Sequence, residues 1–145
     1  MNINKFVLFT LLSLLFIKCS KEKVLSDKDL WYSLNLSNYE MTQQISCFCF
    51  PQDFILPKTI LVENNSVKLI NGMEPIKTIG FESFFTIDEL FEFIEIKLKD
   101  DPEFYQIKYN DIYGFPESIY FDMSQMIADE EIGYTVSNFK VLKND

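Results

Sequence analysis

Two cysteines spaced one residue apart are the most reactive side chains that this sequence offers. Cys47 and Cys49 flank Phe48, and the chain has one other cysteine, Cys19. Apart from Cys19, the thiol count is even, which in an exported protein favours a structural disulfide. The alternatives are buried free thiols that behave as small apolar side chains, a redox-active pair, and a zinc site, which would need two carboxylates as further ligands.

Histidine and arginine are absent, and all 13 basic residues are lysines. Ser-His-Asp and Cys-His catalysis are therefore excluded, and the commonest general base and metal ligand are missing. The glycines are scattered at 72, 80, 114 and 133, so the chain contains no glycine-rich phosphate loop. These features predict a protein that is not an enzyme and that uses no cofactor.

Four acids gather before the last expected strand: Asp122, Asp129, Glu130 and Glu131. Oxygen-rich loops can hold calcium, but the alternating acids and the glycine of an EF-hand loop are missing here. The cluster therefore has two interpretations, a solvated acidic loop or a weak cation site.

Three aromatic side chains near a turn, Tyr113, Phe115 and Tyr120, form a second group of interest. If they were exposed together, they would make a binding patch. Such residues otherwise close the edge of a hydrophobic core, and Gly114 with Pro116 indicates a tight turn between them.

The first 18 residues have the pattern of a lipoprotein-type signal peptide. Lys5 precedes an uncharged apolar run from Phe6 to Ile17, which suits a secretory signal and is too short to span a bilayer. Cys19 follows closely, so we expect cleavage before it and acylation on it, with chains such as palmitate. Lys18 stands where a small residue is usual, which leaves an ordinary secretory signal or an uncleaved anchor as alternatives.

The mature chain is strongly acidic. Cleavage removes Lys5 and Lys18 and no acid, which leaves 11 lysines against 22 Asp and Glu residues. Such a surface repels phosphate backbones, so we expect no nucleic-acid partner. It also disfavours anionic head groups, so the lipid anchor itself must hold the protein at the membrane.

The elements that must position these residues follow from periodicity and capping signals. A helix over 27–36 begins after Ser26, and a strand begins at Tyr39 and carries Cys47 and Cys49 on one face by its period of two. Asn64 and Asn65 mark a hairpin turn. The expected later strands are 59–63, 67–70, 105–109, 118–122 and 134–142, with a bulge between Val136 and Phe139.

A second helix begins at Thr86, where Thr86 to Glu89 fits a capping box. Its apolar stripe predicts the side chains that face the sheet: Ile87, Leu90, Phe91, Ile94 and Leu98. Segregated strands and helices predict an α+β fold, with a single antiparallel sheet of about five to six strands and two main helices packed on one face. The expected organisation is a signal peptide at 1–18, a lipid-attachment cysteine and short tether at 19–26, and one domain at 27–145.

The order of these features resembles the DUF6174 family of bacterial secreted proteins and lipoproteins. The resemblance rests on the helix with Trp31, the Cys47–Cys49 segment, the motif from Thr86 to Phe91, Tyr-Gly-Phe-Pro at 113–116, and Asp-Glu-Glu at 129–131. It implies a single exported domain and carries no activity.

We therefore expect a membrane-tethered lipoprotein domain that faces the periplasm or the cell exterior. Its expected role is a non-enzymatic binding module for a protein or cell-envelope partner. The alternative is a thiol-disulfide or redox-responsive protein that uses Cys47 and Cys49.

Overall fold

The computed structural model describes residues 26–48, 52–75, 84–124, 126–127 and 129–143. Within these ranges, six antiparallel strands form one sheet in the order β3-β2-β1-β6-β5-β4. The strands are β1 (Tyr39–Ser46), β2 (Lys58–Glu63), β3 (Ser66–Ile70), β4 (Phe104–Tyr109), β5 (Pro116–Asp122) and β6 (Ile132–Val141). The helices are α2 (Asp27–Ser33), α3 (Gln52–Ile55) and α4 (Ile87–Lys99).

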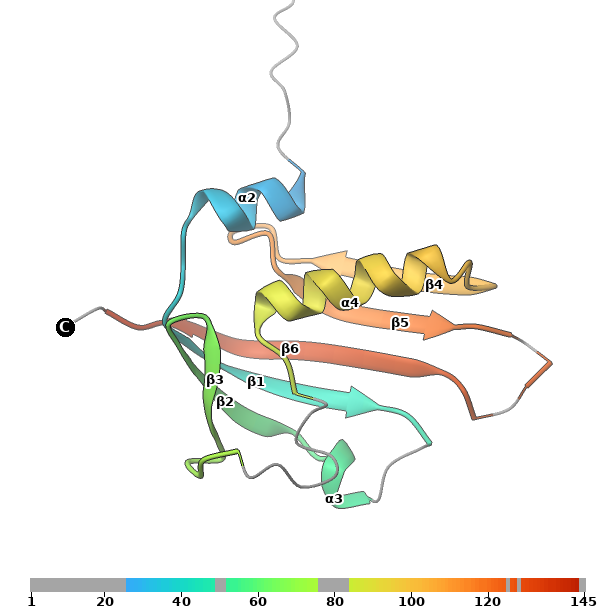
Figure 1. Ribbon diagram of the computed structural model, residues 1–145, viewed down its shortest axis with the longest axis horizontal. Helices are drawn as coiled ribbons and strands as arrows, with labels where there is room; N and C mark the ends of the chain where they lie inside the picture. The colour runs from blue at the N-terminus through green and yellow to red at the C-terminus, as the bar shows by residue number, and fades with distance from the viewer. Residues whose placement is uncertain (1–25, 49–51, 76–83, 125, 128, 144–145) are drawn as a thin grey trace, which may run out of the picture.

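The predicted α+β class, with a single antiparallel sheet and two main helices, is confirmed (Figure 1). The sheet has an inner face, which packs against α4, and an outer face. On β1, Tyr39, Met41, Gln43 and Ile45 are fully buried and define the inner face. The alternate residues from Glu40 to Ser46 therefore point to the outer face. None of the described helices is long and apolar enough to cross a bilayer.

β1 ends earlier than predicted. The strand stops at Ser46, so Cys47 lies just after it, and the prediction that Cys47 continues the strand is wrong. The neighbouring α3 was not predicted at all, because a four-residue helix gives too short a periodic signal to separate it from a loop.

The bulge predicted in β6 is confirmed. Thr42 pairs with Ser137 and Glu40 with Lys140, so β6 carries one more residue than β1 over this interval. Asn138 lies inside that interval with φ of 51°, which is a conformation that Asn tolerates better than most residues. The predicted hairpin turn is confirmed in the same way, since Asn64 and Asn65 have φ of 50° and 57°.

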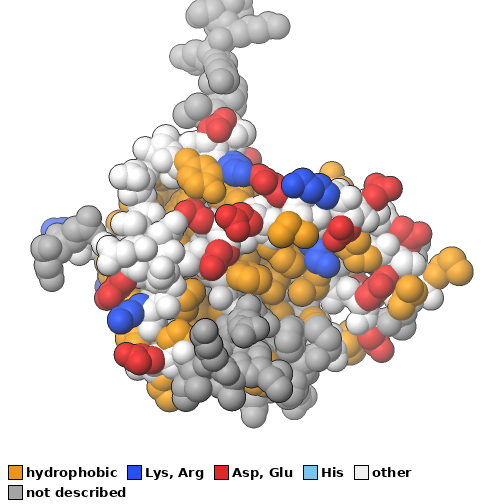
Figure 2. Space-filling view, in the orientation of Figure 1, with side chains coloured by type: hydrophobic (Ala, Val, Ile, Leu, Met, Phe, Trp, Pro, Cys, Tyr) orange, Lys and Arg blue, Asp and Glu red, His pale blue; other side chains and the backbone are white. Residues whose placement is uncertain are grey.

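Helix α4 begins with the predicted capping box. The Thr86 hydroxyl accepts from the Glu89 N–H over 3.2 Å, and the Glu89 carboxylate accepts from the Thr86 N–H over 2.7 Å. The buried stripe of α4 consists of Ile87, Leu90, Phe91 and Ile94. Leu98 is 39% exposed, so its predicted place in the stripe is wrong. Figure 2 shows acidic and basic side chains among apolar ones over the two helices.

Helix α2 closes one end of the core. Its predicted N-cap is confirmed, because the Ser26 side chain accepts from the Asp29 N–H, although the helix ends at Ser33 rather than near 36. Trp31 is 1% exposed and packs edge-on against Tyr39 and Phe115. Gly114 permits this packing, since a Cβ there would lie 2.2 Å from the Asp27 carbonyl oxygen.

Candidate functional site

The cysteine pair lies only partly within the described residues. Cys47 is disulfide-bonded, and the chain has two further cysteines, Cys19 and Cys49. Both lie outside the described ranges, as do the predicted signal peptide at 1–18 and the predicted lipid-attachment site. The pairing of Cys47 with Cys49, and the acylation of Cys19, therefore stay predictions.

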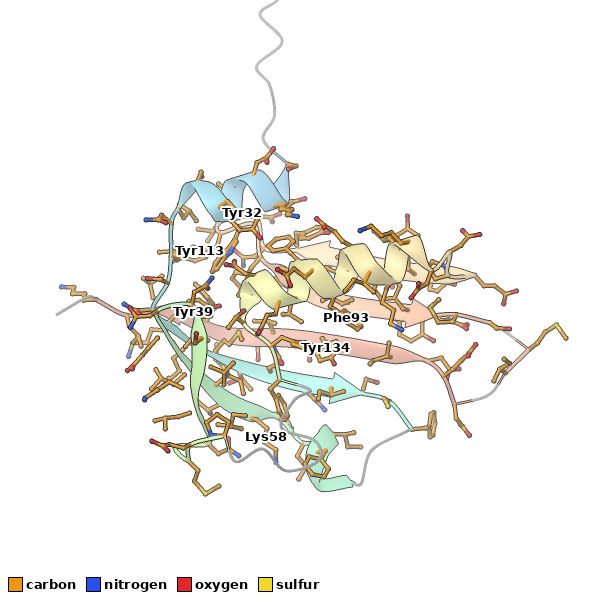
Figure 3. The ribbon with its side chains drawn as sticks, in the orientation of Figure 1. Tyr32, Tyr39, Lys58, Phe93, Tyr113 and Tyr134 are labelled. Carbon is orange, nitrogen blue, oxygen red and sulfur yellow. The ribbon has the colours of Figure 1, made fainter. Side chains whose placement is uncertain are left out.

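The three aromatic residues proposed as a patch lie on opposite faces of the sheet. Phe115 is buried, and Tyr113 stacks on it at 6.2 Å between ring centroids and contacts Phe139 at 5.1 Å. Figure 3 shows Tyr113 below α2, among the core side chains. Tyr120 has the opposite parity on β5 from the buried Ile119 and Phe121, so it points to the outer face.

The acidic cluster is likewise divided. Asp122 ends β5, and Asp129 is exposed with φ of 76°. Glu130 and Glu131 each hold one buried carboxylate oxygen with no hydrogen-bond partner in the described structure. Across the described ranges, no three acidic or cysteine side chains lie close enough to hold a metal ion together.

A cavity on the outer face is lined by residues of β1, β5 and α3 and of the segments after β1 and before β6. Strand register places Ser46 on β1 beside Gly133 on β6, and Gly133 beside Tyr120 on β5. Gly133 has no side chain and lies between Ser46 and Tyr120. A Cβ at Gly133 would lie 3.5 Å from the Ser46 Cβ and 3.8 Å from the Tyr120 ring. We call this cavity the outer-face hollow.

The hollow encloses about 560 Å³ and is open on one side. Its walls are polar near β1 and β6, where Gln44, Ser46 and Glu131 line it. Its rim is apolar, with Cys47, Phe48 and Ile55. Phe48 is 80% exposed. The volume falls within the range of small-molecule sites, which is about 300–1,000 Å³.

The electrostatic character of the hollow is negative. Among the described residues, Glu131 is the one charged side chain that lines it. Burial raises the pKa of Tyr120 above its ordinary value, and the negative charges of Glu131 and Asp122 raise it further. Tyr120, which lines the hollow, also packs against Phe104 at 6.0 Å between ring centroids.

A second polar cluster lies on the inner face, where α4 begins. Trp31 Nε1–H donates to Asp88 Oδ1 over 2.7 Å, and the Tyr39 hydroxyl accepts from the Ile87 N–H over 2.8 Å. The Gln43 side chain accepts from the Phe85 N–H over 2.9 Å and donates to the Phe85 carbonyl over 3.1 Å. We call this cluster the α4 anchor. Its polar atoms are paired inside the fold, so its role is structural.

Sequence reasoning singled out Glu131 and Tyr120 but did not join them. Gln44, Ser46 and Gly133 were not predicted as site residues. The alternation of β1 places Gln44 and Ser46 on the polar face, but their approach to Gly133 and Tyr120 depends on the strand order. The separation of these residues along the sequence does not indicate the strand order.

The comparisons with known proteins agree with the predicted resemblance. A family model described as a family of unknown function, DUF6174, matches residues 23–141. No curated protein and no solved structure matches the chain. The match covers nearly the whole folded region, from before α2 to the end of β6, and the chain therefore belongs to the DUF6174 family.

Proposed function

We propose that the protein is an exported lipoprotein domain, tethered through Cys19, that binds a cell-envelope ligand in the outer-face hollow without transforming it. The sequence supports export and the anchor, and the absence of histidine from the whole chain supports binding rather than catalysis. The domain would face the periplasm or the cell exterior.

The observation that carries this proposal is the composition of the hollow. An apolar rim with Phe48 and Ile55 surrounds the polar side chains of Gln44, Ser46 and Glu131. A largely apolar cavity with a few convergent polar groups is the composition typical of small-molecule sites.

The position of the hollow also suits a tethered binder. Helix α2, which follows the proposed tether, packs on the inner face near Tyr39, at the start of β1. The hollow lies at the other end of β1, on the outer face, where Gln44 and Ser46 line it. A membrane anchor on the α2 side would therefore leave the hollow accessible.

Site-specific photocrosslinking in intact cells tests this proposal. A photoreactive phenylalanine analogue replaces Phe48 at the rim, and in a control chain it replaces Tyr32, which is 48% exposed on the helical side. We expect adducts at position 48, and we expect Ser46→Trp, which fills the hollow, to remove them. Equal adducts at both positions, or adducts that persist with Ser46→Trp, would contradict the proposal.

The lipid anchor has its own test. The native protein should partition into detergent, and its N-terminal peptide should carry the mass of an acyl modification on Cys19. Cys19→Ala should lose both properties. Unmodified Cys19 in native protein would refute the lipid anchor and indicate that Lys18 blocks processing.

One observation favours the second candidate function, a thiol-disulfide or redox-responsive role. Cys47 is disulfide-bonded and lines the rim of the hollow, so a bound molecule would contact its disulfide. A redox role needs an accessible thiolate of lowered pKa after reduction. Rapid alkylation of one cysteine near neutral pH, with loss of a cellular phenotype in the Cys47→Ser, Cys49→Ser double variant, would favour this candidate over simple binding.

A further inference from the structure

We propose that the ligand of the outer-face hollow is a small organic ammonium, a primary amine carried on a short aliphatic body. This inference rests on the proposed function and specifies its ligand. It follows from the charge, the hydrogen-bonding groups, the aromatic wall and the size of the hollow, each taken from a different set of contacts.

The charge of the hollow selects a cation. Glu131 is the one charged residue among its described lining residues, and Asp122 lies near enough to act on the same Tyr120 side chain. An anionic ligand would be repelled, and a neutral one would leave the carboxylate charge uncompensated, whereas an ammonium would form a charge-assisted hydrogen bond with it.

The polar groups select a primary ammonium among cations. Gln44 and Ser46 line the same hollow as Glu131, and each carries an oxygen acceptor. A primary ammonium has three N–H donors and no acceptor, so it can pair with several oxygens at once. A quaternary ammonium has no donor and would leave these oxygens unpaired. A bound metal ion is disfavoured, because no three metal-ligating side chains converge within the described ranges.

The aromatic wall and the rim fit the rest of such a molecule. Tyr120, whose ring is tilted against that of Phe104, lines the hollow, and aromatic rings attract ammonium groups within about 6 Å of the centroid. Phe48, Ile55 and Cys47 form an apolar rim that an aliphatic chain would cover. At about 560 Å³ the hollow is much larger than the roughly 30 Å³ share of one water molecule, so it suits an organic amine rather than ammonium ion itself.

Matched probes that differ in one group test this inference. The full chain, purified in detergent micelles, is titrated with 5-amino-1-pentanol and with 1,5-pentanediol, and binding is followed by NMR shifts of backbone amides. We expect the amine to shift Ser46 and Gly133 and to bind at least about tenfold more tightly than the diol, because the diol lacks the charge-assisted contact. Choline, which has no N–H donor, should bind more weakly than the amine.

Variants locate the contacts. Glu131→Gln and Tyr120→Ala should each weaken amine binding about tenfold, from the lost ion pair and the lost ring. Tyr120→Phe retains the ring and should bind within about twofold of the original. Glu40→Gln makes the same charge change on the same face at the far end of β1, and it should leave binding within about twofold.

One further probe distinguishes a lipid head group from a free amine as the source of the ligand. O-phosphorylethanolamine carries the ammonium of a lipid head group together with a phosphate, which the acidic hollow should repel. We therefore expect it to bind more weakly than 5-amino-1-pentanol, which indicates a free amine. Tighter binding of the phosphorylated probe would contradict the inference that the hollow repels anionic groups.

The failures of the two proposals are distinguishable. If amine and diol bind equally and Glu131→Gln has no effect, the ammonium inference is wrong while the hollow remains a binding site. An absence of shifts at the hollow with the amine up to about 10 mM overturns the inference directly, since that concentration exceeds the Kd of any useful site. The crosslinking experiment at position 48 tests the binding function itself, and its result does not depend on which amine probe is chosen.

Discussion

The α4 anchor and the outer-face hollow both contain polar side chains of β1, but the burial and pairing of those side chains differ between the two regions. In the anchor, Gln43 is fully buried and makes two hydrogen bonds to the backbone of Phe85. In the hollow, the neighbouring Gln44 is exposed and lines a cavity together with Ser46 and Glu131. A one-residue step along a strand thus separates a group that holds the fold together from a group that is free to meet a ligand.

The anchor is effective because it satisfies backbone groups that a helix start leaves unpaired. The first N–H groups of any helix lack partners within it. At α4, the Thr86 hydroxyl accepts from Glu89 N–H and the Tyr39 hydroxyl from Ile87 N–H, and both acceptors come from buried residues. Asp88 also accepts from Trp31 and from Asn65, which ties α2 and the β2–β3 hairpin to the same helix. The comparison therefore predicts large stability effects in the anchor and small ones in the hollow.

The largest effect should come from Trp31→Ala. Trp31 is 1% exposed, so its removal opens a cavity and leaves Asp88 without its indole donor. We expect a loss of about 3–5 kcal/mol in the free energy of unfolding, measured by urea denaturation. Tyr120→Ala in the hollow, which removes a partly exposed ring, should cost about 1 kcal/mol. Similar costs for both variants would remove the distinction between the two regions.

Gln43 and Gln44 provide a closer test, because they are the same residue type on opposite faces. Gln43→Ala leaves the N–H and carbonyl of Phe85 without their partner in a buried place, and we expect a loss of about 2–3 kcal/mol. Gln44→Ala should change stability by less than about 0.5 kcal/mol, as is usual for an exposed position. The contrast is contradicted if chemical denaturation gives equal values for the two variants.

The capping box that begins α4 could be predicted from the sequence, whereas the long-range hydrogen bonds of the α4 anchor and the outer-face hollow could not. Thr86 and Glu89 are three residues apart, so the capping box is a local sequence pattern. The shift in the apolar alternation of β6 likewise predicted its bulge. Ser46 and Gly133 belong to strands far apart in the chain, and their approach is fixed by which strands pair and in what register. Leu98 was wrongly predicted to be buried for a related reason. The apolar stripe continues along α4, but its buried part ends at Ile94.

Alkaline pH should weaken the inner face. Burial raises the pKa of Tyr134 to about 12, and Tyr134 packs against Phe93 at 5.1 Å (Figure 3). The unfolded chain releases this proton near pH 10 and the folded chain only near pH 12, so stability is unchanged below pH 10 and falls between these values. The expected slope is about 1.4 kcal/mol per pH unit from this group.

Other buried tyrosines add to the same trend, since burial also raises the pKa of Tyr39 and Tyr109. Tyr134→Phe isolates the contribution of one ring. In urea melts between pH 9 and 11.5, this variant should lose less stability per pH unit than the original chain. Parallel curves for the two proteins would show that Tyr134 titrates in the folded state as it does in the unfolded state.

The smallest stability effect is expected at Glu131, and it is the most informative one. Glu131 lines the hollow and holds a buried oxygen with no partner among the described residues, so its carboxylate contributes little to the fold. Glu131→Gln keeps the size of the side chain and should change the free energy of unfolding by less than about 0.5 kcal/mol. The same variant should weaken binding of 5-amino-1-pentanol about tenfold. Thr86→Ala is the opposite case, because loss of this cap should cost about 1 kcal/mol and leave binding unchanged. A Glu131→Gln protein that is markedly destabilised would mean that the carboxylate belongs to the fold, and the reason for assigning it to a ligand would disappear.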